Sequence, residues 1–228
     1  MSFIAPHYNK ARQQSLISFF KRDRYWIKTP GWLKKLYPGC IWDMPEKEKT
    51  LYLTFDDGPH PEVTPFVLEE LKKYNARATF FCIGENVAKY PEIYDQLLSG
   101  GHSTGNHTYN HVNGWKTTDT LYLENIIAAE EHIRSNLFRP PYGRMRKSQI
   151  KLLKQQNPEM KIIMWNILAG DWDAAISPAL CFDRIKRKIS QGDIIVFHDS
   201  EKAFDRMKYA LPRVLKLFSE SGFLFKEL

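Results

Sequence analysis

The sequence predicts an α/β fold made of parallel strand–helix units. From residue 50 onward, short apolar runs alternate with segments that have a helical period, as in parallel β/α architectures. Hydrophobic residues make up 43% of the 228 residues and charged residues 26%, which is the composition of a globular chain with its own core. Such units form either an open doubly wound sheet or a closed barrel, and the pattern alone does not choose between them.

The predicted strands are apolar runs bounded by turn-forming residues. They cover residues 51–55, 78–83, 102–106, 137–139, 161–166, 193–197 and 223–225. The predicted helices between them cover residues 64–74, 91–98, 118–136, 147–156, 178–189 and 204–219. One face of the third helix carries its apolar residues Leu123, Ile126, Ile127 and Ile133. The predicted N-caps are Thr64, Thr117 and Ser177.

Residues 1–49 differ from the rest of the chain in charge and aromatic content. They carry ten basic and four acidic side chains, 10 − 4 = +6, which leaves +1 of the total charge of +7 for residues 50–228. Their aromatic residues include Phe19, Phe20, Tyr25, Trp26, Trp32, Tyr37 and Trp42. We therefore divide the chain into a basic aromatic N-terminal arm, 1–49, and a main domain, 50–228. The arm is expected to pack across the domain, with contact to a membrane or an anionic polymer as the alternative.

Composition and motifs disfavour several classes of protein. Nucleic-acid binding is not expected, because no basic stripe or reading module follows the arm. The three cysteines, Cys40, Cys82 and Cys181, are widely spaced and predict reduced, buried thiols. No apolar run approaches the ~18 residues that cross a bilayer, and the first residues lack the features of a signal peptide. As it stands, the sequence predicts a cytoplasmic protein.

Two adjacent carboxylates follow the first strand of the main domain. Asp56 and Asp57 come directly after residues 51–55 and before a Gly58–Pro59 turn. Ligands of β/α folds bind beyond the carboxyl ends of the strands. Neighbouring carboxylates in a cleft favour a cation beside them, so this strand end predicts a metal site. The alternative is a solvated acidic turn.

Two histidines follow the third strand with metal-ligand spacing. His107 and His111 are four residues apart, which would place both imidazoles on one side of a helical turn. His102 is a third candidate ligand. Histidine pairs with this spacing are common without a metal, but together with Asp57 they make a two-His, one-carboxylate site with open positions for water and substrate.

Two further strand ends carry candidate catalytic groups. The stretch 139–143, RPPYG, is stiffened by two prolines, which can fix a peptide N–H as an oxyanion donor and aim Arg139 into the cleft. His198 ends the apolar run 193–197 and is placed to act as a general acid or base. The alternatives are a rigid surface loop for the first and a core histidine capped by Asp199 for the second.

The strings TFDDGP, HSTGNHTYNH, RPPYG and IIVFHDS, in this order, closely resemble the motifs of the NodB-homology polysaccharide deacetylases, carbohydrate esterase family 4. The resemblance covers residues 50–226. It implies a distorted, incomplete (β/α) TIM-like barrel of about seven strands in a single domain. It also implies a divalent metal, commonly Zn²⁺ with Co²⁺ or Ni²⁺ as alternatives, and hydrolysis of the N-acetyl group of an amino sugar in a polysaccharide or glycoconjugate, with release of acetate.

The resemblance assigns roles position by position. Asp56 matches the general base of the family, and Arg139 matches the arginine that orients this base. The metal ligands implied by the resemblance are Asp57, His107 and His111.

The substrate would be bound by a second group of residues. Tyr142 matches the residue whose backbone N–H helps to hold the oxyanion, and Pro140 lies in the same motif. Trp172 and Trp115 are candidates for stacking on a sugar ring, with core packing as the alternative.

One motif departs from the family pattern. His198 matches the general acid, whose usual partner belongs to a strand that ends in Asp-x-x-Asp-Trp. Here the stretch 168–172 reads LAGDW, so Leu168 stands at the position of the first aspartate. The candidate replacements are Asp171, Asp193 and Asp199.

The motifs leave the substrate and the location open. A deacylase of another amide or ester in the same fold is one alternative, and a catalytically weak carbohydrate-binding homologue is another. Polymer deacetylases of this family mostly act on cell-envelope glycans outside the cytoplasm. Either the substrate is an intracellular precursor or glycolipid, or residues 1–49 are not the native start, or export uses another route. Through its basic aromatic arm, the protein could also contact a membrane peripherally and associate with the cell envelope.

Overall fold

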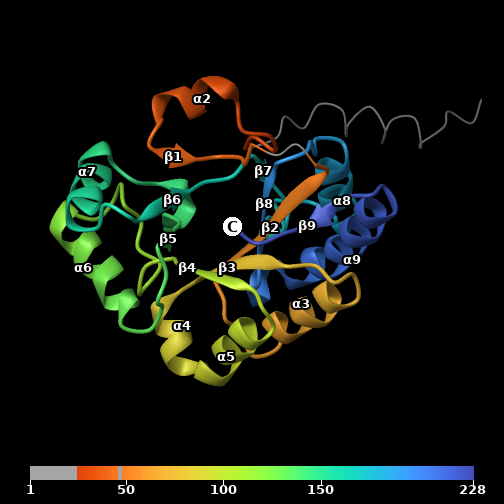
Figure 1. Cartoon of the computed structure of the whole chain (residues 1–228), viewed down its shortest axis with the longest axis horizontal. Coiled ribbons are helices and arrows are strands. Elements are labelled where there is room, and N and C mark those ends of the chain that lie inside the picture. The colour runs from red at the N-terminus through yellow and green to blue at the C-terminus, as the bar shows by residue number, and fades with distance from the viewer. Residues whose placement is uncertain (1–24, 46–47) are drawn as a thin grey trace, which may run out of the picture.

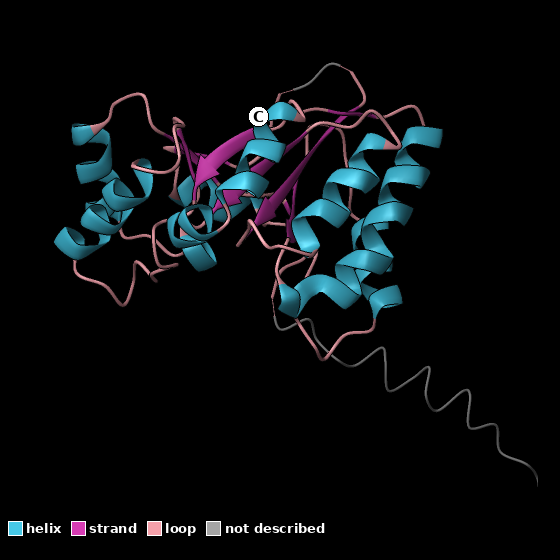
Figure 2. Cartoon of the chain, turned by 90° about the horizontal axis from the view of Figure 1, so that it is seen from below, coloured by secondary structure: helices cyan, strands magenta, loops and turns pink. Residues whose placement is uncertain are grey.

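A curved parallel sheet lies in the middle of the molecule and helices surround it (Figures 1 and 2). The structure is a computed structural model that describes residues 25–45 and 48–228. In these residues nine strands form one sheet in the order β1-β6-β5-β4-β3-β2-β8-β7, with β9 paired to β2. All the pairings between these strands are parallel. The predicted α/β class is confirmed.

The centre of the sheet is buried on both faces. Its strands are β2 (Thr50–Asp56), β3 (Ala78–Cys82) and β8 (Ile194–His198). Strands covered on both sides are apolar at most positions rather than at alternate ones, which is why they are visible as near-continuous runs in the sequence. Phe55 stacks on Phe80 and Phe197, with ring centroids 5.0 and 6.0 Å apart. These rings are part of the main hydrophobic core, between the sheet and the helices.

The two ends of the sheet are joined by a very short connection. β7 (Ile167–Leu168) is the last strand at one end of the strand order, and β6 (Lys161–Ile163) is next to β1 at the other end, yet only residues 164–166 separate β6 from β7. The sheet must therefore curl until its ends approach each other. This closure is the incomplete barrel expected from the family resemblance. The predicted strand 161–166 ends early, at Ile163, because residues 164–166 cross from one end of the sheet toward the other before β7 begins at Ile167.

The described part of the N-terminal arm lies against both ends of the sheet. β1 (Cys40–Ile41) pairs with β6, and Lys28 forms an antiparallel bridge with Ile167 of β7. The short helix α2 (Gly31–Leu36) connects these two segments and has no buried residue. Residues 1–24, which carry Phe19 and Phe20, lie outside the described residues.

The remaining elements follow the predicted alternation of strands and helices. The helices are α3 (Val63–Lys72), α4 (Gly84–Lys89), α5 (Pro91–Ser99), α6 (Asp119–Glu130), α7 (Lys147–Gln156), α8 (Pro178–Lys186) and α9 (Phe204–Glu220). The other strands are β4 (Ser103–Asn106), β5 (Leu137–Phe138) and β9 (Leu224–Phe225). All seven strands and six helices predicted after residue 50 are present, and α4 and β7 were missed because each is too short to show a period.

The predicted helix 118–136 shows where local patterns mislead. α6 ends at Glu130, and Ile133 is buried in the turn that follows it. Ile127 is 48% exposed, so it does not belong to the buried face. The N-cap is Thr118, whose side chain accepts the N–H of Leu121, rather than Thr117. Ser177 caps α8 as predicted, whereas Thr64 lies inside α3.

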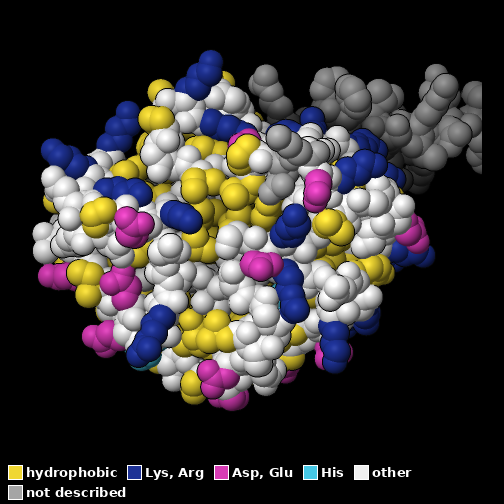
Figure 3. All heavy atoms as spheres, viewed as in Figure 1, with side chains coloured by type: hydrophobic (Ala, Val, Ile, Leu, Met, Phe, Trp, Pro, Cys, Tyr) yellow, Lys and Arg dark blue, Asp and Glu magenta, His cyan; other side chains and the backbone are white. Residues whose placement is uncertain are grey.

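One end of the barrel is filled by the C-terminus. Leu228 packs beside Tyr52 and Ile194, near the amino ends of β2 and β8, and its N–H donates to Thr79 Oγ1 at 2.9 Å. On the face shown in Figure 3, apolar side chains form a patch above the centre, and charged side chains lie beside this patch as well as around the rim. The strand ends that carry the predicted site residues are the opposite, carboxyl ends of these strands.

Two of the three cysteines are buried, as predicted, and Cys40 is half-buried. The thiols of Cys40, Cys82 and Cys181 are free, and the last two are buried. Within residues 25–45 and 48–228, no helix is both long and apolar enough to span a bilayer.

Candidate active site

Asp56 ends β2 and forms a buried ion pair with Arg139. Nη1 of Arg139 donates to Asp56 Oδ1 at 2.6 Å and to Thr54 Oγ1 at 2.7 Å. The guanidinium also donates to the carbonyl groups of Ile163 and Met164, and its side chain is fully buried. Because the guanidinium of Arg139 is held by carbonyl groups at the end of β6 and by Thr54 of β2, it fixes the position of the Asp56 carboxylate.

Asp57 leaves the strand in a left-handed conformation. Its φ is 80°, which turns its side chain out of the direction of β2. The backbone around it is fastened on two sides, because Asn86 Nδ2 donates to the Asp57 carbonyl at 2.7 Å and the Gly58 N–H donates to Asp199 Oδ1 at 3.0 Å. Burial raises the pKa of Asp199 to about 8, against a hydrogen bond from Thr64 that lowers it.

His107 and His111 turn the same ring nitrogen toward Asp57. Nε2 of His107 lies 3.8 Å from Asp57 Oδ1, and Nε2 of His111 lies 3.1 Å from it. The two histidines belong to an irregular loop after β4, with φ values of 64° at Thr108 and 55° at His111. The sequence-based expectation of a helical turn is therefore wrong, although the loop does bring both rings to one side.

The donor set of these three residues fits a divalent metal. Their ligand atoms all lie within 4.8 Å of one another. Nδ1 of His107 bonds the Arg139 carbonyl at 2.7 Å, and because a carbonyl only accepts, the proton is on Nδ1 and Nε2 keeps its lone pair. Asp57 Oδ1 is buried without a hydrogen-bond partner. Lone pairs that converge in this way call for a cation between them.

The pKa values at this triad agree with that fit. Burial lowers the pKa of His107 to about 4, so the ring is neutral at pH 7. Burial alone would raise the pKa of Asp57, but the interactions with His111, His198 and His107 outweigh it and lower the pKa. A neutral imidazole and an ionised carboxylate are the forms in which these side chains bind metals.

His198 ends β8 and is paired with Asp171. Nδ1 of His198 donates to Asp171 Oδ1 at 2.8 Å, and the backbone N–H of His198 donates to Asp171 Oδ2 at 2.7 Å. Burial alone would lower the pKa of His198, but the charge of Asp171 outweighs it and raises the pKa to about 9. The partner of His198 is therefore Asp171 rather than Asp193 or Asp199, and Leu168 is a core residue of β7.

Of the predicted substrate-binding residues, Trp172 and Tyr142 contact residues of the candidate site, whereas Trp115 contacts Arg144. The Trp172 ring lies 4.9 Å from the His198 ring. Tyr142, in the turn after Pro140, is 59% exposed, and its Oη lies 3.1 Å from His111 Nδ1. Trp115 is also exposed, but its ring faces the guanidinium of Arg144 at 5.2 Å.

His102 does not join the candidate metal-binding triad. It precedes β4, at the amino end of that strand, and its Nδ1 accepts the N–H of Ala78 at 3.3 Å. Its ring packs edge-on against Phe80, with centroids 5.5 Å apart. The expectation of a third candidate ligand is wrong because the length of β4 separates His102 from His107.

Three residues that no motif predicted support the site from other elements. Asn86 in α4 binds the turn after β2 directly, through the Asp57 carbonyl. Thr64 in α3 acts indirectly, by donating a hydrogen bond to Asp199. Tyr25 of the arm contacts Trp172, with ring centroids 5.1 Å apart. None of these side chains belongs to a motif, so no sequence signal marks them.

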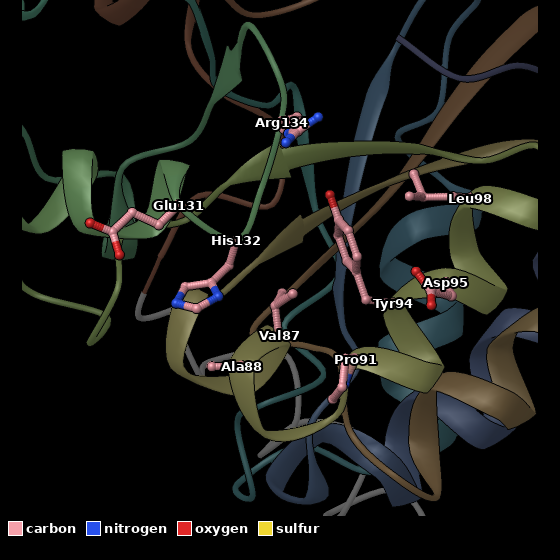
Figure 4. A pocket seen from close by; sticks show the side chains of 9 residues that line it. All are labelled: Val87, Ala88, Pro91, Tyr94, Asp95, Leu98, Glu131, His132 and Arg134. Carbon is pink, nitrogen blue, oxygen red and sulfur yellow. The ribbon is translucent and has the colours of Figure 1, made fainter.

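A separate hollow of about 470 Å³ lies between α4, α5 and the turn after α6. Figure 4 shows Tyr94, Val87 and His132 among the side chains around it. None of the predicted site residues lines this hollow. The candidate site is therefore a different part of the molecule, at the carboxyl ends of β2, β4, β5 and β8.

Fold and site together define a class of barrel hydrolase with a metal-type triad beside a carboxylate–arginine pair and a histidine–carboxylate pair. The sequence model of the polysaccharide deacetylase family matches residues 43–160. The chain belongs to this family, the NodB-homology deacetylases of carbohydrate esterase family 4.

Named relatives are similar over most of the chain. A peptidoglycan-N-acetylglucosamine deacetylase of Bacillus cereus is 32% identical over 189 residues, which cover 81% of this chain and 88% of the relative. A chitooligosaccharide deacetylase of Azorhizobium caulinodans is 34% identical over 161 residues, covering 68% and 75% of the two chains. The crystal structure of the Bc1960 peptidoglycan N-acetylglucosamine deacetylase, in complex with 4-naphthalen-1-yl-N-oxidanyl-benzamide, superposes with a TM-score of 0.79 at 31% identity and covers 88% of this chain and 95% of that one.

Proposed function

We propose that the protein is a metal-dependent hydrolase that removes the N-acetyl group from an amino sugar in a polysaccharide or glycoconjugate and releases acetate. The observation that carries this proposal is the grouping of Asp57, His107 and His111 between a buried carboxylate, Asp56, and a paired imidazole, His198. Hydrolysis of an amide needs a base for water, stabilisation of the oxyanion and an acid for the departing amine. The site offers a candidate for each.

Asp56 is the proposed general base. Arg139 occupies its Oδ1, which leaves Oδ2 to take a proton from the attacking water. The guanidinium holds the carboxylate in one orientation through a hydrogen bond of 2.6 Å. Since both side chains are almost completely buried, the reacting carboxylate is shielded from bulk water.

His198 is the proposed general acid. Its Nδ1 is engaged with Asp171, so the proton on Nε2 is the one available for the nitrogen of the departing amino sugar. Asp171 raises the pKa of His198 to about 9 against the effect of burial, which keeps the ring protonated at neutral pH. After His198 has given up this proton, the negative charge of Asp171 favours protonation of the neutral imidazole for the next turnover.

The proposed cofactor is a divalent cation, Zn²⁺ in preference to Co²⁺ or Ni²⁺. Asp57 Oδ1 and the Nε2 atoms of His107 and His111 would hold it, because two imidazoles and a carboxylate are a common zinc ligand set. When bound, such a cation polarises the amide carbonyl and activates water.

The sugar would be bound around the same strand ends. We propose that the backbone N–H of Tyr142 donates to the oxyanion and that Pro140 keeps this loop rigid. Trp172 and Trp115 are proposed to pack against sugar rings, since aromatic faces bind the apolar faces of sugars. The names of the relatives favour peptidoglycan fragments and chito-oligosaccharides as the first substrates to test.

The test is acetate release from a substrate panel before and after metal exchange. Chito-oligosaccharides, peptidoglycan fragments and simple acetate esters are offered to the full chain after chelation, and again after addition of Zn²⁺ or Co²⁺. Zinc-restored release of acetate from an N-acetyl sugar is the expected result. Binding of one equivalent of metal without cleavage of any acetamide would contradict the proposal, and cleavage of the esters alone would favour a deacylase of another class.

We also propose that the chain divides into an arm, 1–49, and a catalytic domain, 50–228, and that the arm associates with an anionic membrane surface of the cell envelope. The support is the exposed pair Trp26 and Trp32, each about 55% exposed with ring centroids 5.4 Å apart, on a segment with a net positive charge. Sedimentation with vesicles of anionic and zwitterionic lipid tests this. Trp26→Ala/Trp32→Ala should weaken binding to anionic vesicles, and equal binding by this variant and by Trp115→Ala would contradict it.

A further inference from the structure

The arm runs antiparallel along the outer edge of β7. The N–H of Leu168 donates to the Ile27 carbonyl at 2.8 Å, and the N–H of Thr29 donates to the Asn166 carbonyl at 2.8 Å. These bonds satisfy an edge of the sheet that would otherwise be open. Because the arm runs opposite to β7, Tyr25 lies at the carboxyl end of this strand, beside the candidate site.

The loop after β7 is shaped around Tyr25. The Tyr25 ring lies 5.1 Å from the Trp172 ring, its hydroxyl donates to Asp173 Oδ2 at 3.2 Å, and it accepts from Arg184 Nη1 at 3.2 Å. Burial raises the pKa of Tyr25 to about 12, so the hydroxyl keeps its proton. Gly170 has a φ of 74°, and a Cβ there would lie 2.4 Å from Tyr25 Oη. The backbone at Gly170 is therefore packed directly against the Tyr25 side chain.

The same loop carries both groups that hold the imidazole of His198. The Asp171 carboxylate accepts hydrogen bonds from Nδ1 of His198 at 2.8 Å and from the backbone N–H of His198 at 2.7 Å. The Trp172 ring lies 4.9 Å from the imidazole ring. A histidine side chain rotates about its Cα–Cβ and Cβ–Cγ bonds, so a hydrogen bond at one ring nitrogen leaves the plane of the imidazole free to tilt. Packing by Trp172 restricts this tilt, and Tyr25 restricts Trp172.

We propose that Tyr25 is a positioning residue for the general acid: by holding Trp172 and the loop 170–173, it keeps Nε2 of His198 directed at the departing amine. This inference rests on the proposed role of His198 as the acid. The arm thus contributes to catalysis without contacting the reacting atoms, because proton transfer depends steeply on the placement of the acid.

The test compares three variants of the full, zinc-loaded chain. Tyr25→Ala removes the ring, Tyr25→Phe keeps the ring without its hydroxyl, and Tyr37→Ala is the matched control in the same arm, where the Tyr37 ring faces Lys147. We measure kcat and KM for acetate release from a chito-oligosaccharide, and the exchange of the His198 amide by NMR. This amide reports on the loop directly, since its acceptor is the Asp171 side chain.

For Tyr25→Ala we expect kcat to fall about tenfold with KM within about twofold, and exchange of the His198 amide to accelerate relative to other β8 amides. Tyr25→Phe should recover most of kcat, and Tyr37→Ala should match the wild type. Wild-type kcat and wild-type His198 exchange in Tyr25→Ala would overturn the inference, as would equal losses in Tyr25→Ala and Tyr37→Ala. If the wild type releases no acetate, the proposed function fails, while the exchange of the His198 amide still decides the positioning role.

Discussion

The side-chain carboxyl group of Asp199 lies against the backbone of Gly58, whose N–H donates to its Oδ1 at 3.0 Å. The other oxygen accepts a hydrogen bond from the Thr64 hydroxyl at 2.6 Å, and the backbone N–H of Asp199 donates to the Asp56 carbonyl at 3.0 Å. One buried side chain from the end of β8 therefore fixes the turn that carries both carboxylates of the candidate site.

Gly58 cannot accept a side chain without moving this turn. A Cβ at residue 58 would lie 2.0 Å from Asp199 Oδ2, so Gly58→Ala must displace either the carboxyl group or the backbone next to Asp57. We expect a loss of about 2 kcal/mol in the free energy of unfolding, together with weaker zinc binding. Denaturant unfolding and zinc titration measure the two effects.

Gly39→Ala is the control for this change, because nothing lies within 4 Å of its Cβ position. It should retain wild-type stability and zinc affinity. The steric argument would be refuted by a Gly58→Ala variant that unfolds at the same denaturant concentration as the wild type and binds zinc equally well.

Metal content and turnover should separate the two neighbouring aspartates. Asp57→Ala and His107→Ala remove proposed ligands and should lose bound zinc and acetate release together. Asp56→Asn leaves the ligand set intact, so it should retain zinc while turnover falls by 100-fold or more, on the order of the effect of a general base. Elemental analysis of the purified variants, alongside acetate assays, measures both quantities. A His107→Ala variant with full metal content and full turnover would contradict the ligand assignment.

Asp171→Asn should move the alkaline limb of the pH–rate profile to lower pH. The acid must be protonated, and Asp171 raises the pKa of His198 to about 9 against the effect of burial. Without the charge of Asp171, the effect of burial lowers the pKa of His198. The ring then loses its proton at a lower pH than in the wild type. We expect the limb to move by about one pH unit or more. The exposed Asp95 in α5 provides the control, since Asp95→Asn should leave the profile unchanged. An unchanged limb in Asp171→Asn would exclude His198 as the group that titrates there.

The sequence predicted the main strands and the site residues for the same physical reason. In a parallel sheet, the buried strands are continuous apolar runs, and the polar residues that follow them meet at one edge. Asp57, His107, Arg139 and His198 each stand at such a strand end, so their positions along the chain predict that they meet at one edge of the sheet.

Contacts between distant segments could not be predicted in this way. The partner of His198 was left open among three aspartates, because only the path of the chain from β6 to β7 brings Asp171 beside β8. Tyr25 reaches Trp172 across 147 positions of sequence, 172 − 25 = 147, through a pairing with a two-residue strand that has no pattern of its own. Asn86 belongs to a six-residue helix that is too short to show a period.

The environment of His102, which lies apart from the candidate metal site, predicts that the stability of the fold depends on pH. Burial lowers its pKa from 6.5 to about 4, with a further contribution from Arg77. Because the folded pKa lies below the unfolded one, the group stabilises the fold above pH 6.5, and this stability is lost as the pH falls toward 4. Since the ring keeps some contact with solvent, we expect a loss of about 1 kcal/mol rather than the full value for such a shift. His102→Gln should therefore flatten the decline of the free energy of unfolding between pH 6.5 and 4, measured by urea unfolding at several pH values, whereas His132→Gln should leave the slope unchanged. Equal slopes for His102→Gln and the wild type would show that another group is responsible for the loss of stability in acid.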